Sequence, residues 1–227
     1  MPGVKTAAFV TLGCKINQYE TEAIREEILD LGYDEVPFSS AADVYVVNTC
    51  SVTATSGVKS RRYVQRAART NPTARILVVG CSSPAEKAQL ARIPQVAVLA
   101  GNEEKAVVSG FLNGTWEPGA PVERDRADIF HLRISRSHRT RANVKVQDGC
   151  NNFCSFCIIP FLRGRSQSRC PGEVCDEVRR LTAQGHQEVV LTGVHLQDYS
   201  YEPKGGALAR EGGAAATLAD LLRQVVD

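Results

Sequence analysis

The segment Val46-Val47-Asn48-Thr49-Cys50 is the clearest indication of the fold, because a short apolar, β-branched run here ends in polar residues and a cysteine. Such a continuous apolar run is typical of a strand that is buried on both faces of a parallel sheet. Two further segments end in the same way, Phe9-Val10-Thr11-Leu12-Gly13-Cys14 and Val78-Val79-Gly80-Cys81. Residues with helical spacing follow each segment. These repeated β–α units predict an α/β fold in which helices cover both faces of a mainly parallel sheet.

The same alternation extends along the first half of the chain and then stops. We expect strands at 8–12, 44–47, 76–79 and 96–100, and helices at 18–31, 56–69, 84–91 and 103–112. Residues 113–121 are rich in Gly and Pro and indicate a boundary. The polar, basic residues 122–141 are predicted to form a linker or a paired edge segment.

A second β–α pattern begins near Asn143. We expect strands at 144–146 and 188–191, helices at 173–183 and 218–226, and a Gly/Ala-rich loop at 204–216. A region with so few strands cannot close a barrel or shield both sheet edges. We therefore expect the chain to be truncated at its C-terminal end.

The cysteine content bears on both compartment and chemistry. The chain has 8 Cys among 227 residues, a formal net charge of +2 and no run long enough for a membrane helix. The first residues lack the pattern of a secretory signal, so a reducing cytoplasm is expected. In that compartment cysteines are metal ligands or reactive thiols more often than disulfide partners.

One cysteine cluster is local in sequence. Cys150, Cys154 and Cys157 form C-x3-C-x2-C, which places three thiols on one loop that are able to bind three corners of a cubane iron–sulfur cluster. The missing fourth ligand leaves one metal position open for a substrate, as in catalytic sites. The alternative is a zinc knuckle that lacks a ligand, but His138 and Cys170 stand at unusual spacings for zinc.

The other three cysteines are far apart in sequence but share one context. Cys14, Cys50 and Cys81 each end a predicted strand. Because the carboxyl ends of parallel strands meet at one edge, where ligands bind, these thiols are able to converge on a metal. The alternative is three unrelated buried thiols, since Cys is often buried.

The local cysteine motif resembles the radical S-adenosylmethionine (SAM) superfamily. There the open iron binds SAM, and reduction of the cluster cleaves SAM to a 5′-deoxyadenosyl radical. The segment Leu191-Thr192-Gly193-Val194-His195 follows the next strand, where that superfamily often places SAM contacts. The resemblance therefore implies cofactor contacts at Gly193 and His195. The alternatives are a tight turn at Gly193 and an ordinary satisfied polar side chain at His195.

The whole chain resembles the methylthiotransferase family of radical SAM enzymes. The resemblance implies an N-terminal methylthiotransferase domain at 1–117, a linker at 118–140, and at 141–227 the beginning of a radical SAM partial (β/α) barrel, with the family's TRAM domain absent. It also implies two [4Fe-4S] clusters. The auxiliary cluster maps onto Cys14, Cys50 and Cys81, and the radical SAM cluster maps onto Cys150, Cys154 and Cys157. No catalytic side chain is assigned.

The family inserts a methylthio group at an unreactive C–H carbon, with one SAM as methyl donor and a second as radical source. The segment 13–20, GCKINQYE, resembles the branch that modifies N6-threonylcarbamoyladenosine at position 37 of tRNA, and 191–196, LTGVHL, does so too. Other branches, which act on isopentenyladenosine in tRNA or on a ribosomal protein, usually carry Gln or Pro-Lys-Asn after the first cysteine. The implied partners are the tRNA anticodon loop and a reductant such as flavodoxin or ferredoxin, with no membrane. A fragment of this extent is expected to bind clusters yet to lack full activity.

Charge is distributed unevenly along the chain. Residues 58–75 carry six Lys or Arg and no acid, and 119–170 carry ten against four acids. Such blocks either contact phosphates or form solvated faces. Arg163, Gly164 and Arg165 are candidate substrate-side residues, while Cys170 and Cys175 are interpreted as non-ligands. Two non-enzymatic alternatives are a metal-stabilised RNA-binding module and an electron carrier, although ferredoxins normally saturate each cluster with four Cys.

Overall fold

The computed structural model describes residues 4–50, 52–120, 129–202 and 215–226. The chain divides into two compact units, 1–132 and 133–227, and this division falls inside the segment 118–140 that the sequence assigns to a linker. Part of that linker and most of the expected loop 204–216 lie outside the described residues. Within the described ranges, no helix is both long and apolar enough to cross a membrane.

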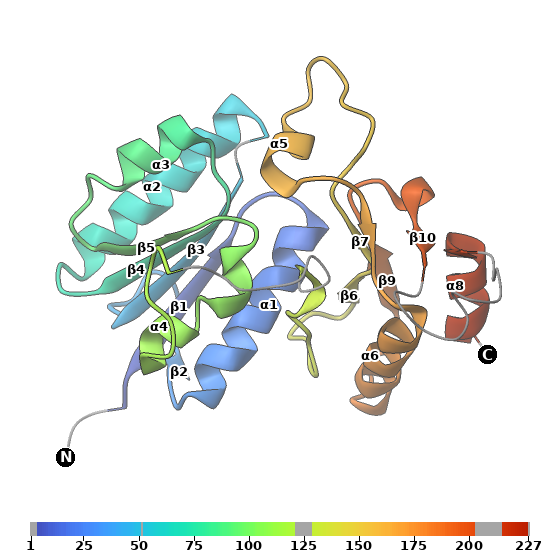
Figure 1. Cartoon of the computed structure of the whole chain (residues 1–227). Helices are drawn as coiled ribbons and strands as arrows, with labels where there is room; N and C mark the ends of the chain where they lie inside the picture. Colours follow the sequence, from blue (N-terminus) through green and yellow to red (C-terminus); the bar gives the residue numbers. More distant parts are fainter. Residues whose placement is uncertain (1–3, 51, 121–128, 203–214, 227) are drawn as a thin grey trace. The chain divides into compact units, whose positions relative to one another are not determined.

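The first unit is built on an all-parallel sheet of five strands (Figure 1). Its strands are β1 (Thr6–Thr11), β2 (Asp34–Glu35), β3 (Val44–Cys50), β4 (Arg75–Cys81) and β5 (Val96–Ala100), in the order β2-β1-β3-β4-β5. The order reverses between β1 and β3, which is the switch point at which open α/β sheets bind ligands. The predicted parallel α/β fold is confirmed. Only the two-residue edge strand β2, made of two acidic residues, was missed.

Helices cover both faces of this sheet. They are α1 (Lys15–Asp30), α2 (Ala54–Thr70) and α3 (Pro84–Leu90), and Figure 1 shows α2 and α3 together on one side and α1 on the other. The side chain of Thr53 caps α2, and Ser83 and Glu86 form a capping box at the start of α3.

The single helix expected at 103–112 is wrong. The structure has a 3-10 turn, η1 (Glu104–Val107), and a separate short helix, α4 (Gly110–Asn113). Lys105 is buried in an ion pair with Glu20 of α1, and Gly110 is a poor residue for a helix interior. Tertiary pairing has therefore overridden the helical spacing of this segment.

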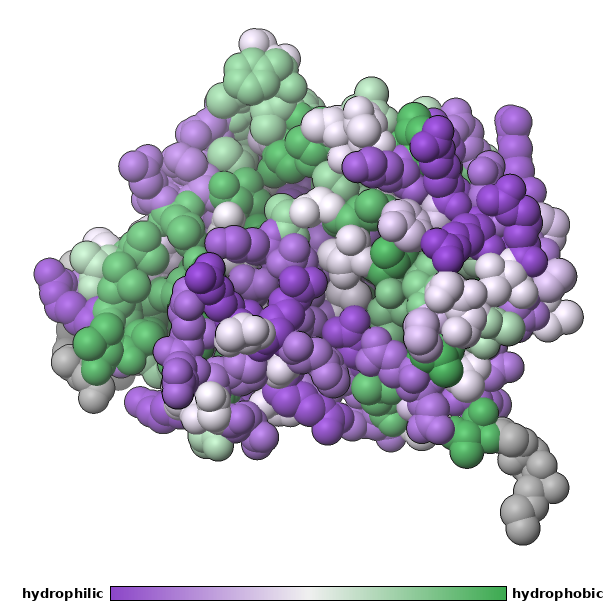
Figure 2. All heavy atoms as spheres, turned by 180° about the vertical axis from the view of Figure 1, so that it is seen from behind, coloured by the Kyte–Doolittle hydropathy of each residue, from purple (hydrophilic) through white to green (hydrophobic). Residues whose placement is uncertain are grey.

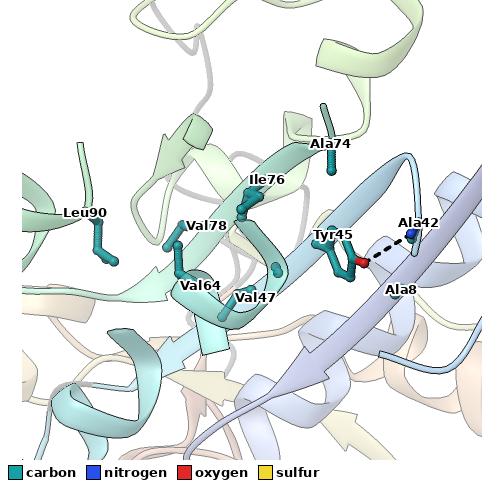
Figure 3. Packing of buried hydrophobic residues seen from close by; sticks show 10 residues of the cluster. Ala8, Ala42, Tyr45, Val47, Val64, Ala74, Ile76, Val78 and Leu90 are labelled. Carbon is teal, nitrogen blue, oxygen red and sulfur yellow. Dashed lines mark hydrogen bonds between the residues drawn. The ribbon is translucent and has the colours of Figure 1, made fainter. Parts of the chain in front are cut away.

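One core cluster of the first unit lies between the sheet and α2 (Figure 3). Val47 and Val78 of the sheet pack with Val64 of α2, and all three are almost completely buried. Tyr45 is also buried, and its hydroxyl donates to Ser40 O and accepts from Ala42 N at 3.1 Å. Burial of side chains this size contributes about 1.5–3 kcal/mol each, which holds the strand ends in fixed positions.

The second unit begins with a parallel pair. β6 (Ala142–Lys145) pairs with β9 (Val189–Thr192), and α6 (Pro171–Ala183) connects them and packs against α8 (Leu218–Val226). Two short antiparallel pairs flank them, and two-residue strands leave no periodicity to predict them. The remaining elements are β7 (Gln147–Asp148) with β8 (Gln167–Ser168), β10 (Ser200–Tyr201) with β11 (Ala216–Thr217), α5 (Ile159–Arg163) and η3 (Leu196–Asp198).

Candidate cysteine sites

The three dispersed cysteines lie at the carboxyl ends of three neighbouring strands. Cys50 and Cys81 are the last residues of β3 and β4 and are direct register partners. Cys14 follows β1 and occupies the N-cap of α1. A Cβ added at Gly13 would lie 3.0 Å from Cys50 Sγ, so the chain beside Cys14 runs directly against Cys50. We call this region of the first unit the cysteine edge.

Asn17 connects two of these strand ends. Its buried side-chain amide donates to Leu12 O at 2.8 Å and to Thr49 O at 2.9 Å, so it joins the chain before Cys14 to the chain before Cys50. Cys14 Sγ also lies 3.9 Å from Asn17 Oδ1. Asn17 was not among the predicted site residues, although its position three residues after Cys14, one helical turn away, is evident in the segment 13–20.

We expect Asn17→Ala to lower the free energy of unfolding by about 2–4 kcal/mol, because it leaves buried carbonyls without their amide donor. Chemical denaturation of the purified chain measures this, with Gln65→Ala, at an exposed position of α2, as the matched control. Asn17→Asp keeps the shape but removes the donor, so it should be no more stable than Asn17→Ala. Wild-type stability in Asn17→Asp would show that the two hydrogen bonds do not hold the edge.

The cysteine edge has suitable donors for an iron–sulfur cluster. Thiolates are the ligands that such clusters prefer, and three of them stand on adjacent strand ends. Cys14 is exposed, whereas Cys50 and Cys81 are buried. Among the described residues, no three Cys, His, Asp or Glu side chains already stand in a metal-holding arrangement. The residue types and their placement fit a cluster, and binding would include a final adjustment of the side chains.

The second cysteine set lies on the loop 149–157 that follows β7. Cys150 is buried, Cys157 is half-buried and Cys154 is exposed. Cys150 N donates to Gly164 O at 3.2 Å, and Cys157 N donates to Cys154 O at 2.9 Å. Gly149 has a φ of +72°, and a Cβ there would collide with the backbone of Arg165, so only glycine fits. The loop therefore folds back on the segment after α5.

A buried ion-pair cluster lies at the start of this loop, around Asp148. Arg163 Nη1 lies 3.0 Å from each Asp148 carboxylate oxygen, and Lys145 Nζ lies 3.1 Å from Asp148 Oδ2. All three side chains are almost fully buried. Arg163, which the sequence offers as a candidate substrate-side residue, is buried here and pairs with Asp148 at the start of the loop. Two cations on one buried carboxylate offset the cost of burying it.

Gln147 brings Gly193 and His195 to the strand that leads into Cys150. Its Nε2 donates to Gly149 O at 2.7 Å, and its Oε1 accepts from His195 N at 2.9 Å. A Cβ at Gly193 would lie 2.8 Å from Gln147 Oε1, so the Gln147 side chain leaves no room for a larger residue at position 193. His195 Nδ1 lies 2.9 Å from Asp198 Oδ1. Gln147 was also missed, although a polar residue directly after an apolar strand was its signal.

We expect Gly193→Ala to lower the free energy of unfolding by about 1–3 kcal/mol, because the new methyl group displaces Gln147. The control is Gly172→Ala, where an added Cβ meets only Cys170 Sγ, at 3.9 Å. Denaturation midpoints of both variants provide the comparison. Equal midpoints for the two variants would contradict the close approach of Gln147 to Gly193.

Aromatic side chains are exposed on and beside the loop. Phe153, Phe156 and Phe161 are 42%, 92% and 77% exposed. Figure 2 shows apolar atoms gathered on the projecting loop that stands at the top of Figure 1. Phe153 and Phe161 meet edge to face at 6.0 Å, and the Arg165 guanidinium lies 4.6 Å from the Phe153 ring centre. Exposed aromatic groups of this size are typical of binding surfaces.

The two remaining cysteines lie at the N-terminal end of α6. Cys170 stands at the N-cap of α6, and buried Cys175 contacts Gln224 O at 3.5 Å. A hydrogen bond with Cys170, followed by burial, raises the pKa of Tyr201. Burial is the main cause that raises the pKa of Tyr199, whose hydroxyl donates to Arg169 O at 2.6 Å.

The chain is similar to known proteins over most of its length. Residues 6–101 match the family described as "Uncharacterized protein family UPF0004". The chain is 41% identical over 206 residues to the "Threonylcarbamoyladenosine tRNA methylthiotransferase MtaB" of Bacillus subtilis, covering 88% of this chain and 46% of that protein. It is 30% identical over 217 residues to the "tRNA-2-methylthio-N(6)-dimethylallyladenosine synthase" of Carboxydothermus hydrogenoformans, covering 91% and 49%.

The chain spans about half the length of the curated relatives it matches. Among solved structures, it is similar to a radical S-adenosylmethionine methyltransferase, TsrM, from Kitasatospora setae, with a TM-score of 0.53 and 14% identity. That alignment covers 86% of this chain and 48% of the other. At this identity the likeness is one of fold alone.

Proposed function

We propose that this chain belongs to the radical SAM methylthiotransferase family and carries cluster-binding parts of an enzyme that methylthiolates C2 of N6-threonylcarbamoyladenosine at position 37 of tRNA. The observation that carries the proposal is the pair of three-cysteine sets. One set lies at the ends of adjacent parallel strands, and the other lies on a single loop that begins at a buried cysteine. The substrate is supported by relatives of 34–41% identity that are named for it.

A second candidate substrate is dimethylallyl (isopentenyl) adenosine in tRNA. Relatives named for that product are 28–33% identical to this chain. The lower identity and the segment GCKINQYE at 13–20 favour the threonylcarbamoyl branch.

In this proposal Cys14, Cys50 and Cys81 hold an auxiliary [4Fe-4S] cluster, and Cys150, Cys154 and Cys157 hold the cluster that binds SAM. Three thiolates on each cluster leave one iron open for a ligand that is not a protein side chain. When bound, clusters and SAM supply the radical chemistry that an unreactive C–H bond demands.

The chain's own side chains position these groups. Asp148, held by Arg163 and Lys145, fixes the strand end before Cys150. Gln147 holds the backbone of His195 beside that strand and faces Gly193, where SAM contacts are proposed. Asn17 keeps the chain before Cys14 and the chain before Cys50 in register.

The proposed function requires an RNA partner and an electron donor. The nucleic-acid partner is the tRNA anticodon loop, and a cytoplasmic flavodoxin or ferredoxin is the electron donor. Phe153 and Phe161 offer rings on which unpaired bases stack, as in other proteins that bind single-stranded RNA.

Anaerobic reconstitution with iron and sulfide tests the cluster proposal. The wild-type chain should bind about eight iron atoms, and each triple Cys→Ala variant, at 14/50/81 or at 150/154/157, about four. Cys170→Ala is the matched control and should keep the wild-type iron content. Zinc without sulfide in the wild-type chain would instead support a zinc-stabilised RNA-binding module.

Nucleoside mass spectrometry tests the substrate. Deletion of the gene should remove 2-methylthio-N6-threonylcarbamoyladenosine from tRNA, and reintroduction of the gene should restore it. Unchanged levels of that nucleoside, with loss of 2-methylthio-isopentenyladenosine, would transfer the proposal to the second substrate.

A further inference from the structure

Helix α2 carries an unusual row of cations on one face. Its residues Ala54–Thr70 include no Asp or Glu. Four of its five basic residues are exposed and follow one another at intervals of three, four and three: Lys59, Arg62, Arg66 and Arg69. At 3.6 residues per turn these four directions fall within about 80° of one another, over a length of about 15 Å. We call this row the basic stripe.

The opposite face of α2 fixes the direction of the stripe. Ser60, Val64 and Ala67 are buried against the sheet, so the helix cannot rotate to bury its cations. The fifth cation, Arg61, lies 3.9 Å from Glu86 of α3. Within the described residues, no ion pair neutralises any member of the stripe. The stripe is therefore a fixed row of positive charge.

Helix α1 shows that this charge is not a general property of the unit. α1 lies on the other face of the sheet and carries five acids, of which Glu20 and Glu22 are buried, against Lys15 and Arg25 (Figure 1). A face that serves only solubility normally mixes both signs. The chain instead separates them, so that an anionic partner would be drawn to the α2 side.

The position of the stripe relates it to the cysteine edge. α2 begins four residues after Cys50, so its N-terminal end starts at the edge where β3 ends. The stripe then runs away from that edge along the helix. Lys and Arg side chains at this spacing are suited to successive backbone phosphates, which they bind without reading sequence.

We propose that the basic stripe binds the phosphate backbone of the substrate RNA and holds it beside the cysteine edge. This inference rests on the proposed tRNA-modifying function and adds to it a surface that is separate from the cysteine sets. The contact is electrostatic, so it should contribute to affinity and to its salt dependence rather than to the choice of base.

The test compares binding of fluorescently labelled tRNA by the purified chain and by K59Q/R62Q/R66Q/R69Q between about 50 and 200 mM salt. Neutralising four phosphate contacts should reduce the slope of log K against log salt by about 3, and weaken binding at the lowest salt at least about tenfold. R62Q/R66Q should give about half of the slope change. Circular dichroism should be unchanged, because all four side chains are exposed.

The matched control is R92Q/R179Q/R180Q/R223Q, which removes the same charge from exposed positions elsewhere and should keep the wild-type slope within about 1 unit. Equal slopes for the stripe variant and the wild type would overturn the proposal, as would absence of tRNA binding by the wild type. Stripe-dependent binding to phosphatidylserine vesicles without tRNA binding would also overturn it. Iron content is measured on the same samples, so a failure of the cluster proposal is recognised separately.

Discussion

Replacing Cys154 by alanine is expected to abolish SAM cleavage by the anaerobically reconstituted protein, with 5′-deoxyadenosine falling to the level of iron-free protein. Removal of one of three thiols leaves a cubane cluster with two unprotected corners, and iron should fall by about four atoms per chain. Cys154 is exposed, and its backbone carbonyl accepts from Cys157 N, a hydrogen bond that alanine keeps. Loss of activity in Cys154→Ala would therefore indicate the loss of a cluster ligand and not unfolding of the loop.

Ser155→Ala is the neighbouring control, because it changes another exposed position of the same loop and removes no thiol. Chromatography of 5′-deoxyadenosine and iron counting should both distinguish it from Cys154→Ala. Undiminished cleavage by Cys154→Ala would contradict the assignment of this loop as the radical SAM site. Loss of cleavage in both variants would indicate that the loop conformation matters more than the thiol.

The architecture of the first unit was predictable because its strands are buried on both faces. Every residue of Val44–Cys50 is buried, and burial on both faces favours the largely apolar run that identifies this strand in the sequence. The same reasoning fails where tertiary contacts decide. Lys105 looks like an ordinary surface residue of a helix, yet its ion pair with buried Glu20 belongs to a different conformation. Nothing local to residues 103–112 indicates that partner.

The candidate sites divide in the same way. Thiols that end successive strands are recognisable in the sequence, because the carboxyl ends of parallel strands lie at the same edge of the sheet. The roles of Asn17 and Gln147 become evident only once two distant segments are adjacent, since each side chain hydrogen-bonds to a residue 32 or more positions away. Arg163 shows the reverse error. Basic residues near a proposed RNA site suggest phosphate contacts, but Arg163 is buried in an ion pair with Asp148 and stabilises the loop.

In the enzyme whose cluster-binding parts this chain carries, replacing Cys50 by alanine is expected to leave SAM cleavage intact while abolishing the methylthio product. Cys50 belongs to the first unit, whereas the loop with Cys150, Cys154 and Cys157 belongs to the second. Each unit has its own core and hydrogen bonds, so loss of the auxiliary cluster leaves the other loop undisturbed. Iron should fall by about four atoms per chain, as in Cys154→Ala. The two variants would then contain equal iron but differ in the step that fails.

Comparing Cys50→Ala with Cys154→Ala distinguishes a role in sulfur insertion from a role in SAM cleavage, which an assay of the final product alone would not do. Cys50 is 8% exposed, so alanine leaves a small void beside Gly13, and unfolding of the variant is measured first to exclude a general loss of structure. Cys170→Ala, at the start of α6, is the control and should retain both cleavage and product. Methylthio product from Cys50→Ala would remove the auxiliary cluster from the proposal. Loss of SAM cleavage in a folded Cys50→Ala variant would mean that the two cysteine sets are coupled.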